Sequence, residues 1–281
     1  MRLGDGRVLS FAEQGDPAGR PVFFFHGING SRLLRHPDES IARRLGLRIF
    51  TFDRPGLGLS TPKPHRRILD WPLDVAEFAD AQGLERFAVI AWSGGGPYAL
   101  ATAHRFGDRV SKVGLVAPMA PLAGTTLTRE LSPALRRPAR IAQIVPGFLR
   151  VAAARDRRGF MRDPAGFLAR EFANGPECDR AALDRPGFKQ MLILNRYETY
   201  RQGSGGLATD ALLYLRPWGF QPSEVRAPIR RWVGEHDQTL LPAMARYFDQ
   251  QLRGSTATVV AGEGHMLCLT RWEQVLEELR A

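Results

Sequence analysis

Three residues, far apart in a chain of 281, have the types and the order needed for acyl chemistry. Ser93 stands in a glycine-rich stretch, Asp237 ends the stretch Gly-Glu-His-Asp, and His265 directly follows a glycine. An imidazole can take the proton of a serine hydroxyl and later return it to a leaving group, while a carboxylate fixes the tautomer of the imidazole. The order Ser, Asp, His differs from the orders of the chymotrypsin and subtilisin types. We predict that the three residues form a catalytic triad.

The serine is expected at a sharp turn between a strand and a helix. Residues 91–97 read Ala-Trp-Ser-Gly-Gly-Gly-Pro, which matches the nucleophile-elbow pattern Gly-x-Ser-x-Gly with Ala91 at the first position. Bulky residues at either end of this pattern would clash across the turn. The backbone N–H of Gly94, at a helix N-terminus, and that of Ile28, in the glycine-containing loop at residues 26–30, could together hold a developing oxyanion. We predict that Ile28 and Gly94 form an oxyanion hole.

Two assignments stay open at this point. Glu235, two residues before Asp237, is a second carboxylate that could orient the histidine, although Asp237 is preferred. Trp92, Met119 and Met266 flank the segments described above and could line a substrate pocket. Ordinary core packing accounts for each of these three side chains at least as well.

The chemical segments are expected to be loops at one edge of a parallel sheet. Short apolar runs predict strands at residues 22–25, 48–52, 87–92, 112–117, 229–233 and 257–260, with an antiparallel edge strand at 8–13. Helical patterns cover residues 31–45, 70–82, 94–106 and 272–279. Strands that alternate with helices form parallel sheets, and such sheets bind ligands at the carboxyl ends of their strands. The loops can therefore converge.

Residues 121–205 interrupt this alternation. They contain no convincing strand, but repeated prolines that we expect at the first turns of several short, arginine-rich helices. The sequence therefore predicts a core made of residues 1–120 and 206–281, with a helical cap inserted at 121–205.

Composition limits the class of protein. A content of 44% apolar and 24% charged residues suits a globular fold with a sizeable core. No apolar run is close to the roughly 20 residues that span a bilayer, and the start has no apolar signal-peptide core, so we expect a cytoplasmic protein with no membrane partner. Cys178 and Cys268 are expected to be free thiols rather than part of a metal site.

The net charge of +10 could indicate a nucleic-acid partner, but the pattern of charges argues against one. Only three of the 39 basic residues are lysines, the arginines form pairs rather than long runs, and no nucleic-acid-binding motif is present. The basic excess is concentrated in residues 125–203, which carry 15 basic and 8 acidic side chains. We expect these to form a solvated helix face, with a basic substrate pocket as the alternative.

Together these motifs make the sequence resemble the α/β-hydrolase superfamily over residues 20–120 and 205–281. Residues 53–60, Asp-Arg-Pro-Gly-Leu-Gly-Leu-Ser, are similar to the Asp-x-x-Gly-x-Gly-x-Ser loop of that family, which follows its fourth strand and is structural in most members. The resemblance implies an α/β fold with a mostly parallel central sheet of about eight strands flanked by helices. It also implies a helical cap, which usually decides the substrate.

The type of nucleophile narrows the activities that this resemblance implies. Dehalogenases and epoxide hydrolases of the superfamily carry Asp where this chain has Ser93, whereas esterases, lipases, carbon–carbon bond hydrolases, aminopeptidases and perhydrolases keep Ser. The leading hypothesis is a serine hydrolase, monomer or homodimer, that cleaves an ester or related acyl bond of a small molecule through an acyl-enzyme without a cofactor. The alternatives are a carbon–carbon bond hydrolase of ring-cleavage products and a non-catalytic small-molecule-binding protein of this fold.

Overall fold

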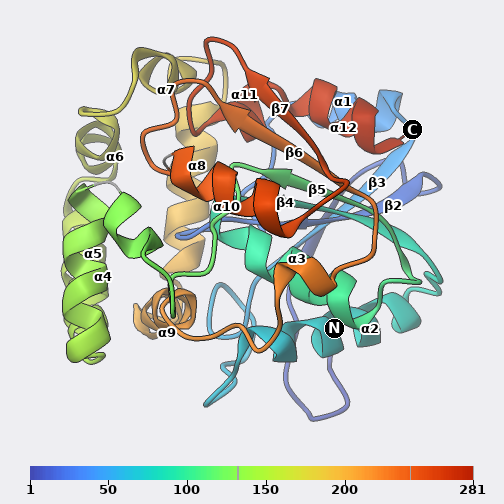
Figure 1. The fold of residues 1–281 in the computed structure, drawn as a ribbon, viewed down its shortest axis with the longest axis horizontal. Coiled ribbons are helices and arrows are strands. Elements are labelled where there is room, and N and C mark those ends of the chain that lie inside the picture. The colour runs from blue at the N-terminus through green and yellow to red at the C-terminus, as the bar shows by residue number, and fades with distance from the viewer. Residues whose placement is uncertain (132, 241, 281) are drawn as a thin grey trace.

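One mixed sheet carries the loops of interest. The computed structural model describes residues 1–131, 133–240 and 242–280 (Figure 1). Within them seven strands pair in the order β1-β3-β2-β4-β5-β6-β7. The strands are β1 (Phe11–Gly15), β2 (Arg20–Phe25), β3 (Leu47–Phe52), β4 (Phe87–Trp92), β5 (Val110–Val116), β6 (Ile229–Gly234) and β7 (Thr256–Val260). Among these strands only β1 runs antiparallel to its neighbour, so the expected mostly parallel sheet is confirmed.

Helices cover both faces of this sheet. Those outside the β5–β6 connection are α1 (Ser40–Arg44), α2 (Trp71–Ala81), α3 (Gly96–Arg105), α10 (Pro242–Gln251), α11 (Leu267–Thr270) and α12 (Trp272–Arg280). Successive side chains of a strand point to opposite faces: Phe23 and Phe25 of β2 pack in one core with α2 and α3, whereas Val22 and Phe24 pack in another with α1 and α12. Figure 1 shows these two pairs of helices on opposite sides of the sheet. Burial on both faces explains why the central strands are continuous apolar runs.

The chain between β5 and β6 folds into helices. They are α4 (Pro133–Ile144), α5 (Phe148–Arg162), α6 (Pro164–Phe172), α7 (Glu177–Ala182), α8 (Phe188–Thr199) and α9 (Gly205–Tyr214). Figure 1 shows α4, α5 and α6 farthest from the sheet, with α8 between them and the strands. Pro133 and Pro164 begin helices as expected, but Pro138 lies inside α4, where the prediction of a first-turn position is wrong. Within the described ranges no helix is both long and apolar enough to cross a bilayer.

The prediction of a helix at residues 31–45 is wrong for most of that range. Only α1, at Ser40–Arg44, forms there. The backbone N–H groups of Ser31 and Arg32 donate instead to the side chains of Asn195 and Asp53, at 2.8 and 2.7 Å. A proline in the same stretch has no N–H to give to a helix. Side chains of distant segments, rather than a helical ladder, therefore hold the chain before α1.

The antiparallel edge strand, expected at residues 8–13, begins later, at Phe11. Val8 makes an isolated bridge with Arg2, and the backbone N–H of Leu9 donates to the carbonyl of Met1 at 2.9 Å. The N–H of Leu9 is thus used in a small N-terminal hairpin, whereas the backbone N–H groups of Val8 and Ser10 donate to the hydroxyls of Thr61 and Ser60.

Candidate active site

Ser93 stands at the sharp turn that joins β4 to α3. Its backbone φ is +54°, a left-handed conformation that costs a non-glycine residue about 1–3 kcal/mol. The turn lies so close to β2 that a Cβ on Gly95 would overlap the carbonyl oxygen of Phe25. Pro97 follows in the first turn of α3, where its missing N–H is no loss. The sequence pattern around Ser93 thus forms a strained strand-turn-helix, as predicted.

The imidazole of His265 bridges Ser93 and Asp237. Its Nε2 lies 3.1 Å from Oγ of Ser93, and its Nδ1 lies 2.8 Å from Oδ2 of Asp237. Oδ1 of Asp237 accepts the backbone N–H groups of Thr239 and Leu240, at 2.8 and 3.1 Å, which fixes the carboxylate. With Nδ1–H donating to Asp237, Nε2 is left to accept the serine proton. The loops after β4, β6 and β7 bring these three residues together at one edge of the sheet.

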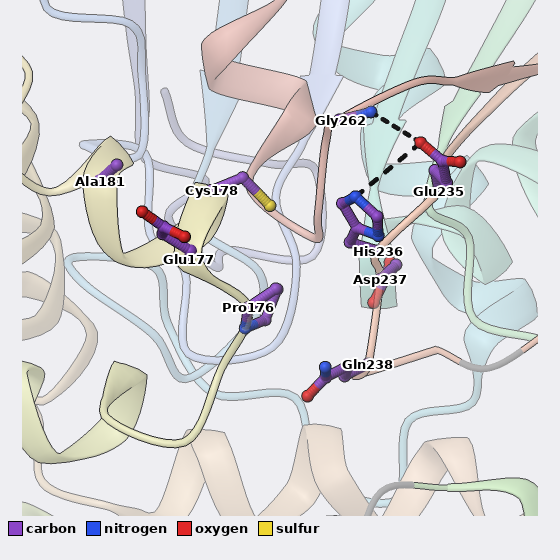
Figure 2. Close-up of a pocket in the computed structure, with 9 residues that line it drawn as sticks. All are labelled: Pro176, Glu177, Cys178, Ala181, Glu235, His236, Asp237, Gln238 and Gly262. Carbon is purple, nitrogen blue, oxygen red and sulfur yellow. Dashed lines mark hydrogen bonds and ion pairs between the residues drawn. The ribbon is translucent and has the colours of Figure 1, made fainter.

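Glu235, the alternative carboxylate, has other partners. One of its oxygens accepts the backbone N–H of Gly262 at 2.9 Å and lies 3.8 Å from Nε2 of His236. Figure 2 shows both contacts at the rim of an open pocket beside Asp237. The structure therefore joins Asp237, and not Glu235, to the imidazole of His265.

Electrostatics in the site favour an imidazole that can take a proton. Burial alone would lower the pKa of His265, but the charge and hydrogen bond of Asp237, with the charge of Asp179, raise that pKa above its ordinary value. Burial would raise the pKa of Asp237, yet the charge of His265 and the hydrogen bonds that Asp237 accepts lower it. Asp237 is therefore ionised when His265 is protonated, and the imidazolium is stabilised.

The loop at residues 26–30 passes directly beside the elbow. A Cβ on Gly27 would lie 3.1 Å from Cβ of Ser93, and a Cβ on Gly94 would lie 2.9 Å from Cγ1 of Ile28. Ile28 and Gly94 are thus neighbours, next to the serine. Within the part of the chain that the structure describes, the backbone N–H of Ile28 has no acceptor, so this donor is available to a ligand.

A buried arginine holds this loop from behind. Arg54 donates to the carbonyl oxygens of His26 and Gly27, at 2.7 and 3.0 Å, and pairs with Asp210 of α9 at 2.7 Å. Burial, and then the charge of Arg54, lower the pKa of His26 to about 3, so a neutral imidazole braces the loop. Asp210 also pairs with Arg66. Sequence reasoning treated residues 53–60 as a turn and missed the arginine inside that motif.

Helix α8 holds the same loop from the other side. The carbonyl oxygen of Asn29 accepts hydrogen bonds from Nδ2 of Asn195 and from Oγ1 of Thr199, both at 3.0 Å. Asn29 itself has a φ of +62°, which asparagine adopts more readily than most residues. No local pattern in the sequence indicated that these α8 side chains meet a loop about 170 positions earlier, and sequence reasoning missed them.

A cavity of about 820 Å³, called here the Ser93 cavity, opens onto Ser93 and His265. Trp92, Met119 and Met266 all line it, and each is at most 7% exposed, so they serve both the pocket and the core. The opposite wall comes from the helices between β5 and β6. Its apolar side chains include Leu135, Leu168, Phe172 and Leu192.

The Ser93 cavity carries few charges. Arg196 is the only one of the 15 basic residues in 125–203 that lines it, among the residues described. Both carboxylate oxygens of Glu171, which also lines the cavity, accept hydrogen bonds from Nη2 of Arg196 at 2.9 Å. Asp179 is the other ionisable carboxylate of the lining. Most basic side chains of residues 125–203 therefore lie away from the cavity that contains Ser93.

Potential metal ligands are dispersed in the described ranges, and the two cysteines are not paired. No group of three or more His, Cys, Asp or Glu side chains there is placed to hold a metal ion. Cys178 and Cys268 are free cysteines, as expected.

A mostly parallel sheet with a strained serine after β4 and an Asp–His pair in the loops after β6 and β7 places the protein among the α/β hydrolases. The profile of the alpha/beta hydrolase fold family matches residues 20–271, and the chain belongs to this family. The expected fold is therefore confirmed.

The chain is similar to a peptidase, an enol-lactonase and an esterase. The chain is 31% identical over 122 residues to a proline iminopeptidase from Xylella fastidiosa. The matched region covers 40% of this chain and 36% of that protein. It resembles the enol-lactonase from Burkholderia xenovorans with a TM-score of 0.70 and 19% identity, over 98% of this chain and 97% of that one. It resembles an esterase from Exiguobacterium antarcticum with a TM-score of 0.71 and 18% identity, over 99% and 96%. At these identities the structural likeness shows the fold, and the curated relative is matched over little more than a third of its length.

Proposed function

We propose that the protein is a serine hydrolase that cleaves an ester or related acyl bond of a small molecule. The observation that carries this proposal is the hydrogen-bonded bridge from Ser93 through His265 to Asp237. Membership of a hydrolase family supports it, as do the names of the esterase and enol-lactonase of similar fold. We assign Ser93 as nucleophile, His265 as general base and then acid, and Asp237 as the residue that orients and stabilises the imidazole.

The reaction follows from this geometry. Oγ of Ser93 attacks the carbonyl carbon while Nε2 of His265 takes its proton, and the N–H groups of Ile28 and Gly94 bind the oxyanion that forms. His265 then gives the proton to the leaving alkoxide, which departs as an alcohol and leaves an acyl-enzyme. Water, activated by His265, attacks the acyl-enzyme, and collapse of the second intermediate releases the acid and returns the proton to Ser93. No step requires a metal or an organic cofactor.

The lining of the Ser93 cavity supports an uncharged substrate. Its walls are mainly apolar, and Arg196 is already paired with Glu171. A carboxylate on the substrate would have to give up its hydration for an arginine that is shared with a protein carboxylate. This lowers the support for a carbon–carbon bond hydrolase of anionic ring-cleavage products, whose case rested on a basic pocket.

The remaining predictions concern the setting of the reaction. The helical segment between β5 and β6 supplies one wall of the cavity, which supports a role as a substrate-selecting cap. A cytoplasmic location, the lack of a nucleic-acid or membrane partner, and a monomer or homodimer stay predictions.

Labelling by a fluorophosphonate probe tests the proposed function. Wild-type protein is expected to be labelled at Ser93, and Ser93→Ala protein of unchanged melting temperature is expected not to be. A series of p-nitrophenyl esters of increasing acyl length then measures the size of the pocket through kcat/KM. Folded wild-type protein that resists labelling and hydrolyses none of the esters would overturn the proposal in favour of a non-catalytic binding protein.

A further inference from the structure

The carboxylate of Asp179 clamps the backbone of the loop that carries His265. Its Oδ2 accepts the backbone N–H of His265 at 3.0 Å, and its Oδ1 accepts the backbone N–H of Met266 at 2.8 Å. The residue is 4% exposed and lines the Ser93 cavity. Two consecutive amides of a catalytic loop are therefore held by one side chain, which comes from a helix more than 80 residues earlier in the chain.

Asp179 reaches this loop from α7, in the helical segment between β5 and β6. Figure 2 shows the start of α7 facing the loop after β6 across an open pocket of about 690 Å³. Glu177 and Cys178 line that pocket, whereas Asp179 lines the Ser93 cavity instead. Of these three residues of α7, only Asp179 lines the cavity that opens onto Ser93 and His265.

The loop is shaped to fit this carboxylate. A Cβ on Gly264 would lie 2.5 Å from Oδ1 of Asp179, so any larger residue before His265 would displace this carboxylate. On the other side of the same residue, the carbonyl oxygen of His265 accepts the indole N–H of Trp92 at 2.9 Å. Side chains from α7 and β4 therefore hold both backbone polar groups of His265.

The backbone position of His265 matters because its imidazole has to meet two partners at once. A shift of the loop by a fraction of an ångström changes the distance to Ser93 and the distance to Asp237 together. Displacements of about 1 Å far from the reacting atoms can cost a hundredfold in rate. We propose that Asp179 is a positioning residue of the active site, which fixes the backbone of His265 and places a second carboxylate near its imidazole.

This inference rests on the proposed hydrolase function, and it predicts a pH dependence. The titratable groups that face His265 are Asp237 and Asp179. Burial, together with the charge of Asp237, raises the pKa of Asp179 above its ordinary value, although the hydrogen bonds that it accepts from two backbone N–H groups and the charge of His265 oppose this rise. Cys178 and Glu263 lie close by, and burial raises the pKa of the Cys178 thiol, so this thiol stays neutral. Removal of the charge of Asp179 should therefore lower the pKa of His265, because Asp179 helps to raise it.

The test is Asp179→Asn, with Glu177→Gln as a matched control on the same helix. The amide keeps the shape of the side chain, but its NH₂ faces a backbone N–H that has lost its acceptor. With a p-nitrophenyl ester, kcat should fall about ten- to a hundredfold while KM changes little, and the acid limb of the kcat/KM profile should move to lower pH. Glu177→Gln, which removes an exposed charge from α7, should leave kcat and the pH profile unchanged.

The outcomes separate this inference from the proposed function. Wild-type protein that neither reacts with a fluorophosphonate nor hydrolyses esters would refute the hydrolase itself. An active wild type, with Asp179→Asn equal to it in kcat and in pH profile, would refute the positioning role alone. A lower melting temperature with an unmoved acid limb would show that Asp179 is merely structural. If Asp179→Asn does not fold, Gly264→Ala displaces the carboxylate without removing its charge and should lower kcat with a smaller shift of the acid limb.

Discussion

The indole N–H of Trp92 donates to the backbone carbonyl of His265 at 2.9 Å, and the centroids of the two rings lie 5.6 Å apart. Trp92 is the last residue of β4 and directly precedes Ser93. The strand that presents the serine therefore also anchors the loop that presents the histidine. This contact links the positions of the Ser93 and His265 side chains.

Loss of this anchor should weaken catalysis more than binding. Trp92→Phe keeps an aromatic ring in the cavity wall but leaves the carbonyl of His265 without its donor, at a cost of about 1–3 kcal/mol in stability. We expect kcat to fall while KM for a p-nitrophenyl ester changes little. Steady-state kinetics and thermal melts measure the two effects. A variant with unchanged kcat would show that the histidine loop needs no anchor on β4.

The rate of the enzyme should depend on a pKa above the ordinary histidine value. In the proposed mechanism His265 accepts the serine proton only when it is neutral. Burial lowers its pKa, but the charge and hydrogen bond of Asp237 raise the pKa above 6.5. Activity should therefore be lost as pH falls through this raised value. In Asp237→Asn the acid limb should move to lower pH, and kcat should fall by about 10⁴. The profile of kcat/KM against pH, for both proteins, tests the assignment.

The ion pairs of Asp210 should make a large contribution to stability. Its carboxylate lies between the guanidinium groups of Arg54 and Arg66, so that Asp210→Asn leaves two buried charges uncompensated. Removal of one partner from such a pair costs about 3–5 kcal/mol. Urea unfolding at pH 7 measures this loss, and Asp184→Asn, at an exposed position, serves as the control. Equal stability of the two variants would contradict the expectation.

The same network predicts how stability responds to acid. Burial would raise the pKa of Asp210, but the charges of Arg54 and Arg66 outweigh it and lower the pKa from 3.8 to about 2. A carboxylate with a lowered folded-state pKa stabilises the fold above its unfolded value, and that stabilisation is lost as pH falls through the folded value. The contribution of Asp210 should therefore be complete above pH 3.8 and decline toward pH 2. Unfolding free energies of wild type and Asp210→Asn should converge over this range.

The charge of the acyl group should decide between substrates of equal length. The Ser93 cavity offers apolar walls and an arginine already paired with Glu171. The p-nitrophenyl ester of valeric acid should therefore be cleaved with a kcat/KM at least roughly tenfold higher than that of the p-nitrophenyl monoester of glutaric acid. Equal values, or a preference for the anionic ester, would favour a basic pocket.

The features that depend on neighbouring residues in the chain, such as the turn at Ser93 and the central strands, were predicted most accurately from the sequence. Small residues around Ser93 are needed wherever a strand turns so sharply, and apolar runs are needed wherever a strand is buried on both faces, so the elbow and the central strands could be read directly. The helix expected at residues 31–45 failed because Asn195 and Asp53 take its first backbone donors. Asp179 went unnoticed for a related reason, since nothing near it in the chain indicates the histidine loop that it holds.

Charge was the least informative part of the sequence. The basic excess in residues 125–203 left a basic pocket open as an alternative, but among the described residues only Arg196 of that group lines the Ser93 cavity. Composition gives the number of charges on a segment, whereas the direction in which each helix faces decides what those charges meet.

The contacts of the helical segment also bear on how new specificities could be engineered in this protein. Asp179 of α7, Asn195 of α8 and Asp210 of α9 each bind a part of the core that supports the reacting groups, through the histidine loop, the loop at residues 26–30 and Arg54. A chimera that received this segment from another hydrolase is expected to lose the proposed activity unless the donor segment supplies equivalents of these three side chains. Wall residues of the Ser93 cavity that make no such contact, such as Leu168 and Phe172, are the better targets for exchange one at a time.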